Sequence, residues 1–213
     1  MRHVTPHERL LAQARDPRLT TSALLAQALE AVRQDWESDQ DIHNPALLIL
    51  QQRVTEEVFV AASTLCMRPD PAERHLGVLI LREFPGLGRP KPFAVRALPV
   101  LERLVERETD ALVLSFAVSA IGWQQHPLAR PLLLRFLHHP DAALRRLVAS
   151  NLTCCDLANP LPPESIRAYE QLCQDPDDDV RWYAHATLQD LVEYAVPLPP
   201  AQKAALTRLL AGG

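Results

Sequence analysis

The feature that most constrains this chain is a turn followed by an apolar helix, found at residues 138–152 and again at 174–188. In the second copy Asp175-Pro176 ends the preceding helix, because proline has no amide hydrogen to donate. The residues that then share one helical face are Val180, Tyr183, Ala184, Thr187 and Leu188. The two copies start thirty-six positions apart, a period typical of solenoids built from stacked helix pairs.

Acidic residues mark the point where this helix begins. Asp177, Asp178 and Asp179 follow the proline, where carboxylates accept free amides of the first turn and suit the helix dipole. The run has the charge of a calcium loop but lacks the glycine and the terminal glutamate of an EF-hand. It therefore predicts helix capping rather than a calcium site.

A small residue is expected at the centre of each buried face. Ala184 lets neighbouring helices approach closely, and Gly77 takes the same place in an earlier segment. Glycine inside a helix costs about 1 kcal/mol relative to alanine. Close packing against the next helix is the expected reason for it.

The amino-acid composition limits the possible fold classes and the possible classes of binding partner. The 213 residues are 47% apolar with few aromatics and six glycines, which favours helices over sheets. The net charge of −4 predicts no general attraction to nucleic acid or to an anionic membrane. Arginine carries nearly all the positive charge, since Lys91 and Lys203 are the only lysines, a bias that indicates a GC-rich bacterial genome.

The cysteines and the apolar segments indicate a cytoplasmic protein. Residues 1–18 are polar, unlike a signal peptide, and the apolar run 111–123 is too short to span a bilayer. No CxxC pair is present, so we expect no zinc site but reduced, mostly buried thiols. The cysteines concerned are Cys66, Cys154, Cys155 and Cys173. The adjacent His138 and His139 point in different directions and predict no metal site.

The same turn and helix signals predict twelve helices along the chain. They span residues 7–14, 20–36, 45–53, 56–66, 72–84, 93–107, 110–123, 128–138, 141–155, 164–173, 178–194 and 201–211. Pro99 and Pro131 hold equivalent places in two of them and predict the same first-turn start or kink. Residues 85–92, rich in glycine and proline, predict a loop that is either an insertion or a binding loop.

The repeats are predicted to form one domain over residues 1–213. Residues 1–53 would be a degenerate first repeat with a connecting helix, and residues 54–195 four further repeats. Residues 196–213 would be a capping helix that closes the open end of the core. We expect the stack to have about five repeats in all.

Residues 175–188 read Asp-Pro-Asp-x-x-Val-Arg-x-x-Ala-x-x-Thr-Leu, which resembles a HEAT repeat of the bacterial type similar to those of phycobilin lyases. Residues 110–122 and 141–152 fit this pattern more loosely, and residues 53–62 with 69–81 resemble other bacterial HEAT-repeat proteins. The resemblance implies an all-α fold, an α-solenoid (superhelix) of antiparallel helix pairs. It leaves function open, because such proteins serve as scaffolds, inhibitors, adaptors, lyase subunits and DNA-repair proteins.

Three arginines recur at one place in the repeat, namely Arg74, Arg145 and Arg181. One interpretation is a row of guanidinium groups that faces an acidic ligand. The other is a structural ladder, in which each arginine meets a backbone carbonyl or an acid of an adjacent turn, with Asp70, Asp141 and Asp177 as candidates. Leu114 interrupts the row in the intervening repeat, which weakens the case for a continuous basic groove.

Four further residues should lie beside the buried faces of the second helices, namely His75, Arg146, Trp182 and His185. Second helices line the concave surface of a solenoid, its usual binding surface. An aromatic ring beside arginine and histidine there suits a peptide anchor. The alternative is that residues 201–211 partly cover Trp182 and His185.

No nucleophile with a base, no phosphate-binding loop and no metal triad is evident. We therefore expect a non-catalytic module, with no cofactor and no metal, that binds another protein or peptide segment through the concave surface as a monomer. The predicted partner-binding residues are Arg74, His75, Arg146, Arg181, Trp182 and His185. The alternatives are a nucleic-acid-binding protein similar to HEAT-type DNA glycosylases, supported by the arginine row, and an enzyme subunit similar to the bilin lyases.

Overall fold

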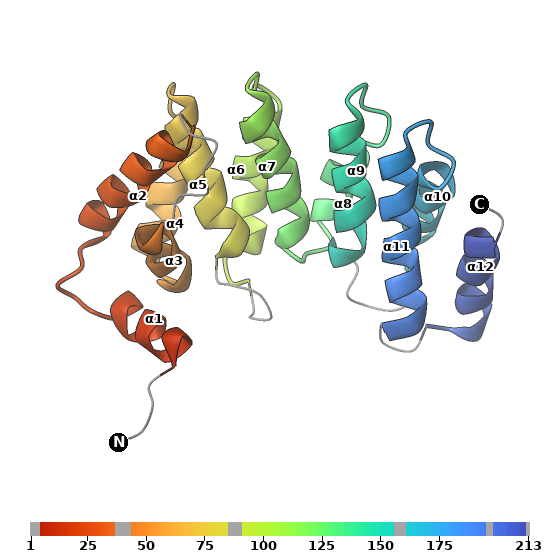
Figure 1. The fold of residues 1–213 in the computed structure, drawn as a ribbon, viewed down its shortest axis with the longest axis horizontal. Helices are drawn as coiled ribbons and strands as arrows, with labels where there is room; N and C mark the ends of the chain where they lie inside the picture. Colours follow the sequence, from red (N-terminus) through yellow and green to blue (C-terminus); the bar gives the residue numbers. More distant parts are fainter. Residues whose placement is uncertain (1–4, 37–43, 85–90, 156–160, 195–197, 212–213) are drawn as a thin grey trace. The chain divides into compact units, whose positions relative to one another are not determined.

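The computed structural model describes residues 5–36, 44–84, 91–155, 161–194 and 198–211 (Figure 1). These residues form twelve α-helices and one short 3-10 helix, and none of them forms a strand. The predicted all-α fold is confirmed. The chain divides into two compact units, Met1–Ala120 and Ile121–Gly213, and each is described by itself. A single domain over the whole chain stays a prediction.

The helix boundaries follow the expected turns closely. The helices are α1 Pro6–Ala14, α2 Thr21–Trp36, α3 Pro45–Gln52, α4 Glu56–Leu65, α5 Pro71–Glu83, α6 Ala94–Val105, α7 Ala111–Trp123, α8 Ala129–Leu134, α9 Ala142–Asn151, α10 Pro163–Leu172, α11 Asp178–Tyr194 and α12 Pro200–Ala211. Two predicted ends are wrong, because α8 stops at Leu134 and the 3-10 helix Leu152–Cys155 continues α9. Most of the predicted loop 85–92 lies outside the described residues.

Acidic residues cap the second helix in each of the last four pairs, as predicted for α11. The carboxylate of Asp70 accepts the amide of Ala72 at the start of α5, at 3.0 Å. Asp110, Asp141 and Asp177 make equivalent bonds at the starts of α7, α9 and α11. Each carboxylate supplies one of the acceptors that a first helical turn lacks.

The predicted buried face is confirmed at three places in each of the last three repeats. The third, seventh and eleventh residues after the cap are at most 1% exposed: Val113, Ala117, Ile121, Leu144, Val148, Leu152, Val180, Ala184 and Leu188. Tyr183 was expected on the same face, but it is exposed. It lies at the edge of the apolar stripe, where a large ring reaches past the neighbouring helix into solvent.

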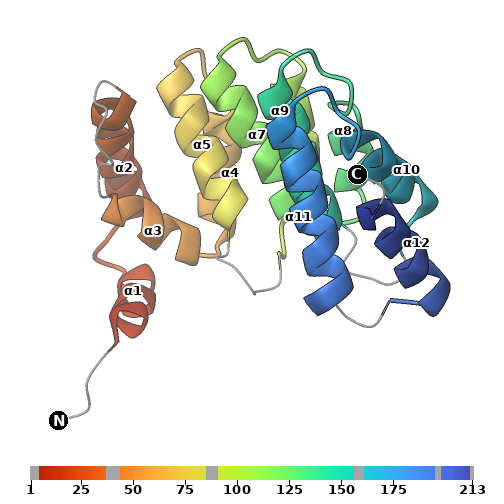
Figure 2. The same ribbon diagram turned by 45° about the vertical axis from the view of Figure 1, so that its right-hand side comes forward.

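In the first unit α2 and α5 lie side by side and α4 packs against α5 (Figures 1 and 2). Gly77 of α5 allows a close approach, because a Cβ atom there would lie 2.7 Å from the Ala62 carbonyl oxygen and 2.8 Å from the Cys66 amide nitrogen of α4 and its C-cap. The expected reason for this glycine is therefore confirmed. The guanidinium of Arg53 donates to the carbonyl of Ala14, at the end of α1, and to the carbonyl of Leu19 in the following turn.

In the second unit α9 and α11 lie side by side, and α10 contacts both (Figures 1 and 2). The buried Tyr169 hydroxyl of α10 donates to the Ala149 carbonyl of α9 at 2.9 Å. The terminal α12 packs against α11 and buries Leu206. Gln202 of α12 exchanges two hydrogen bonds with the backbone of Leu161, at 2.9 and 3.0 Å.

All four cysteines are unpaired, as expected. Cys66, Cys155 and Cys173 are buried, and Cys154 is half-buried. Burial raises the pKa of the Cys66 thiol to about 12 and that of Cys173 to about 11, so both are protonated and unreactive at neutral pH. Within the described ranges, every helix is too short or too polar to cross a bilayer.

Candidate functional site

The first residue of the arginine row, Arg74, is held in an ion pair. Its guanidinium donates to both carboxylate oxygens of Glu108, at 2.7 and 2.8 Å, and to the carbonyls of Arg68 and Pro69. The Arg74 side chain is 13% exposed and that of Glu108 only 1%. Burial would raise the pKa of Glu108, but the bonds from Arg74 and the Asp110 amide outweigh it and lower that pKa.

Arg145 repeats this arrangement in the second unit. It donates to both carboxylate oxygens of Asp175, each at 2.8 Å, and to the carbonyls of His139 and Pro140. The hydrogen bond from Arg145 holds the pKa of Asp175 below its ordinary value. Arg181 donates to the Asp175 carbonyl at 2.6 Å and pairs with the exposed carboxylate of Asp178.

The ladder interpretation of the arginine row is therefore confirmed, but with other acids than expected. The arginine lies four residues after one cap, and its acid lies two residues before the next cap rather than at the caps Asp70, Asp141 and Asp177. Where Leu114 replaces the arginine, His139 takes the place of the acid. The acid and the arginine are thus present together or absent together at these repeats.

His75, another predicted partner-binding residue, belongs to the core of the first unit. It is buried, and its ring meets that of Phe116 edge-on at 4.7 Å. Burial lowers the pKa of the imidazole to about 4, against the opposing charges of Asp110 and Asp35. A neutral, covered histidine is a packing residue in this structure, so the surface role of His75 receives no support.

Arg146 and Trp182 come together on the surface of α9 and α11. Trp182 is 63% exposed, and its ring meets that of Tyr183 edge-on, with centroids 4.9 Å apart. The guanidinium of Arg146 lies 5.5 Å from the Tyr183 ring centroid and 3.7 Å from the carboxylate of Asp179. We call Arg146, Asp179, Trp182 and Tyr183 the aromatic cluster.

The alternative in which residues 201–211 partly cover Trp182 and His185 stays a prediction, but the indole of Trp182 is largely exposed. His185 lies about one turn further along α11 and is half-buried. The Tyr183 ring contacts the indole of Trp182, and the guanidinium of Arg146 lies over the Tyr183 ring and links it to α9. Tryptophan, tyrosine and arginine side chains are the types that contribute most at protein interfaces.

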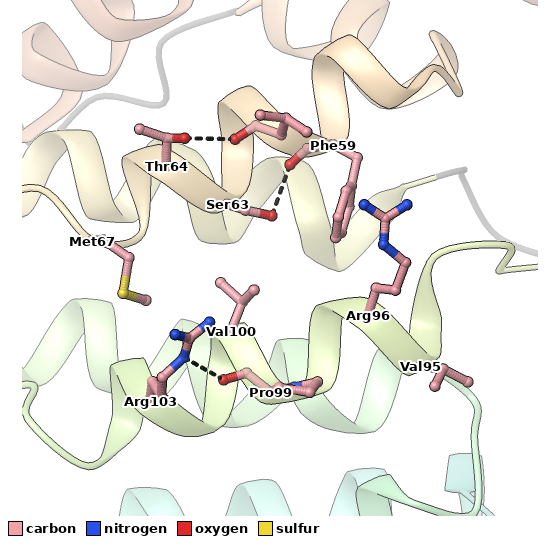
Figure 3. A pocket seen from close by; sticks show the side chains of 10 residues that line it. Phe59, Ser63, Thr64, Met67, Val95, Arg96, Pro99, Val100 and Arg103 are labelled. Atoms are coloured by element: carbon pink, nitrogen blue, oxygen red, sulfur yellow. Dashed lines mark hydrogen bonds between the residues drawn. The ribbon is translucent and has the colours of Figure 1, made fainter.

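A second surface feature was not singled out from the sequence. A groove of about 640 Å³ runs between α4 and α6 in the first unit (Figure 3). Apolar side chains line most of it, including Phe59, Met67 and Val100, and the exposed Val60 and Val95. The sequence analysis gave these two helices only their bounds. The available signal was that Val60 and Val95 fall off the buried faces.

The described residues offer little for metal or acid–base chemistry. No group of three or more potential metal ligands gathers among them. The cysteines with raised pKa are buried or half-buried thiols, and the histidine with a shifted pKa is a core residue.

The comparisons with known proteins support the fold. No family model matches the chain, and no curated protein matches it in sequence. Among solved structures it is similar to the crystal structure of YibA from Escherichia coli, a helical HEAT-like repeat protein, with a TM-score of 0.59 and 15% identity over 99% of this chain and 76% of that one. At this identity the likeness concerns the fold alone, and it is consistent with an α-solenoid.

Proposed function

We propose that this chain is a cytoplasmic, bacterial HEAT-like module that binds another protein through the aromatic cluster on α9 and α11. The observation that carries the proposal is Trp182, a large apolar side chain that stays 63% exposed while Tyr183 holds it from the side. Exposing an indole forfeits the free energy of burying it, about 2 kcal/mol for a large apolar side chain. A partner that covers the ring would recover that free energy.

The surroundings of Trp182 resemble the centre of a protein interface. Arg146 and Asp179 lie at its edge and offer a donor and an acceptor to a partner. Their 3.7 Å separation and exposure make a weak pair, since exposed ion pairs contribute little. A partner can therefore replace this contact at small cost.

The nucleic-acid and bilin-lyase-like alternatives have less support. The nucleic-acid hypothesis depended on the arginine row, and Arg74 and Arg145 are already paired with buried carboxylates. The net charge is −4, which opposes binding to phosphate. We expect no binding to duplex DNA at low salt and no absorption above the protein band in purified material.

The test is affinity capture from native cell extract with the full chain as bait, read by mass spectrometry. Wild type is compared with the double variant Arg146→Glu/Trp182→Ala and with Leu128→Ala, a control that also removes an exposed apolar side chain from the second unit. We expect one stoichiometric partner with wild type and with the control. The double variant should lose it while keeping its melting temperature, because Arg146 and Trp182 are not in the core.

The same partner is then purified and its affinity measured directly. A loss of at least tenfold on Trp182→Ala is the ordinary size for a central interface residue. A partner that binds the double variant as tightly as wild type would place the binding surface elsewhere. Capture of nothing by any of the three baits would count against a stable protein partner.

A further inference from the structure

The groove between α4 and α6 is open, apolar and long enough for a short segment. Its α6 wall runs from Val95 to Arg103, which is about 12 Å at 1.5 Å per residue. Val60 and Val95 face solvent with 49% and 55% of their surface exposed. Figure 3 shows the Val100 side chain and the Phe59 ring in the space between the two helices. About two turns of a helix would fill this length.

The two ends of the groove differ in charge. At one end Arg96 stacks over the Phe59 ring at 4.5 Å and pairs with both carboxylate oxygens of Glu56. At the other end Arg103 donates only to the carbonyl of Pro99, at 3.2 Å, and no carboxylate of the described chain pairs with it. That end therefore carries a positive charge that no described carboxylate pairs with.

Arg107 strengthens this positive end. It lies in the turn that follows α6, two residues after the last helical residue, Val105. Its guanidinium donates to the Cys66 carbonyl at 3.1 Å, beside the groove residue Met67, and likewise has no carboxylate partner in the described part of the chain. Two exposed guanidinium groups thus stand at one end of an apolar groove in a chain of net charge −4.

Pro99 interrupts the hydrogen-bond ladder of the α6 wall. It lies inside α6 and lines the groove. Because proline has no amide hydrogen, it leaves the carbonyl of Val95, four residues earlier, without its helical donor.

We infer that this groove is a second binding site, and that it takes a short acidic amphipathic segment of a partner protein. Two or three apolar side chains on one face of a helix would cover Val60, Val95 and Val100. An aspartate or glutamate beyond them would pair with Arg103 and Arg107, which form bidentate bonds with carboxylates. Helices that lay an apolar face into a groove are a recurrent mode of recognition. This site is separate from the aromatic cluster in its residues and in its chemistry.

The test is to pan a random library of displayed twelve-residue peptides against the full chain. We expect the enriched peptides to share apolar residues at helical spacing and a carboxylate at one end. Val60→Asp and Arg103→Glu should each weaken their binding roughly tenfold. Leu112→Asp, which places the same charge on an exposed leucine of α7, should leave it unchanged. All variants are checked for an unaltered melting temperature.

A second panning against Arg103→Glu tests the charge directly. It should enrich peptides with lysine or arginine in place of the acid, a reversal that a purely structural arginine would not cause. The inference is overturned if no peptide is enriched, if the peptides bind Val60→Asp as tightly as wild type, or if they carry no carboxylate. Peptides lost only with Trp182→Ala would support the aromatic cluster and not this groove.

Discussion

At the scale of single residues, one amino-acid type has two different roles at the same repeat position. Arg74 and Arg145 each join an acid about thirty residues away and the carbonyls of their own turn. Among the described residues, Arg181 bonds only to its own turn, through the Asp175 carbonyl and the Asp178 carboxylate. Its side chain is also more exposed than those of Arg74 and Arg145. The sequence shows the repeated arginine, but the acid it meets depends on how the next helix pair is placed.

Removing a ladder arginine should destabilise the fold. In Arg145→Ala the carboxylate of Asp175, 7% exposed, loses its partner but keeps its charge. We expect a loss of about 3 kcal/mol in the free energy of unfolding, measured by urea denaturation at pH 7. Arg18→Ala is the control, because Arg18 is 88% exposed in its pair with Asp16, and its loss should change the free energy of unfolding far less. Equal losses for both would refute the structural role of the ladder.

His75 should make stability depend on pH. Its pKa is about 4 in the folded protein against 6.5 as the ordinary value, so between these values the unfolded chain binds more protons. Stability is then complete above pH 6.5 and falls as the pH drops from 6.5 to 4, by about 3 kcal/mol. The carboxylates of Glu108 and Asp175 have lowered pKa values, so their contribution is lost at lower pH.

Replacing the imidazole isolates its contribution. His75→Leu should flatten the urea-denaturation midpoint between pH 6.5 and 4, whatever the variant does to stability at pH 7. The acid-induced loss below pH 4 should remain, because the carboxylates are still present. A variant whose midpoint falls as steeply as that of wild type over this interval would show that another group titrates there.

At the scale of elements, contacts between neighbouring helices decide details that periodicity leaves open. Pro99 and Pro131 were expected to act alike, but Pro99 lies inside α6 and Pro131 falls in the first turn of the short α8. That expectation is wrong, because α8 begins only at Ala129. An internal proline and a first-turn proline differ physically, because the internal proline removes a hydrogen bond from the helix and the first-turn proline does not.

The contact between α4 and α5 should not tolerate one extra methyl group. Gly77→Ala gains helix propensity, about 1 kcal/mol, but its Cβ would lie 2.7 Å from a backbone oxygen of α4. Backbone cannot rotate away as a side chain can, so we expect a net loss of about 1–3 kcal/mol. Thermal denaturation measures it, with Ala204→Gly on exposed α12 as the control for propensity. A raised melting temperature for Gly77→Ala would refute the close packing.

At the scale of the whole molecule, a repeat protein must cover the apolar side of its last repeat. In the second unit α12 packs against α11, and Leu206 of α12 is fully buried. Leu206→Asp should therefore lower the melting temperature strongly, through a loss of about 3 kcal/mol or more. The neighbouring Thr207→Asp places the same charge on an exposed site and should have little effect. Similar melting temperatures for both variants would mean that α12 is dispensable.

The sequence by itself determined most of the helices, the acidic cap of α11 and the residues at the centre of the buried faces. The reason is that these features depend on residues close in the chain: an acid before a first turn, a proline in a turn, and apolar residues at helical spacing. Val180, Ala184 and Leu188 were assigned correctly in this way. The same local signals predicted that Tyr183 would be buried, but its side chain is exposed.

Only the tertiary structure decided which groups meet and which stay exposed. Arg145 finds Asp175 thirty residues away, and His75 is covered by Phe116 while Trp182, at the same repeat position, is not. The groove between α4 and α6 exists because two first helices lie next to each other without burying Val60 and Val95. Exposure depends on what the neighbouring helices cover, and helices packed against one another come from distant parts of the sequence.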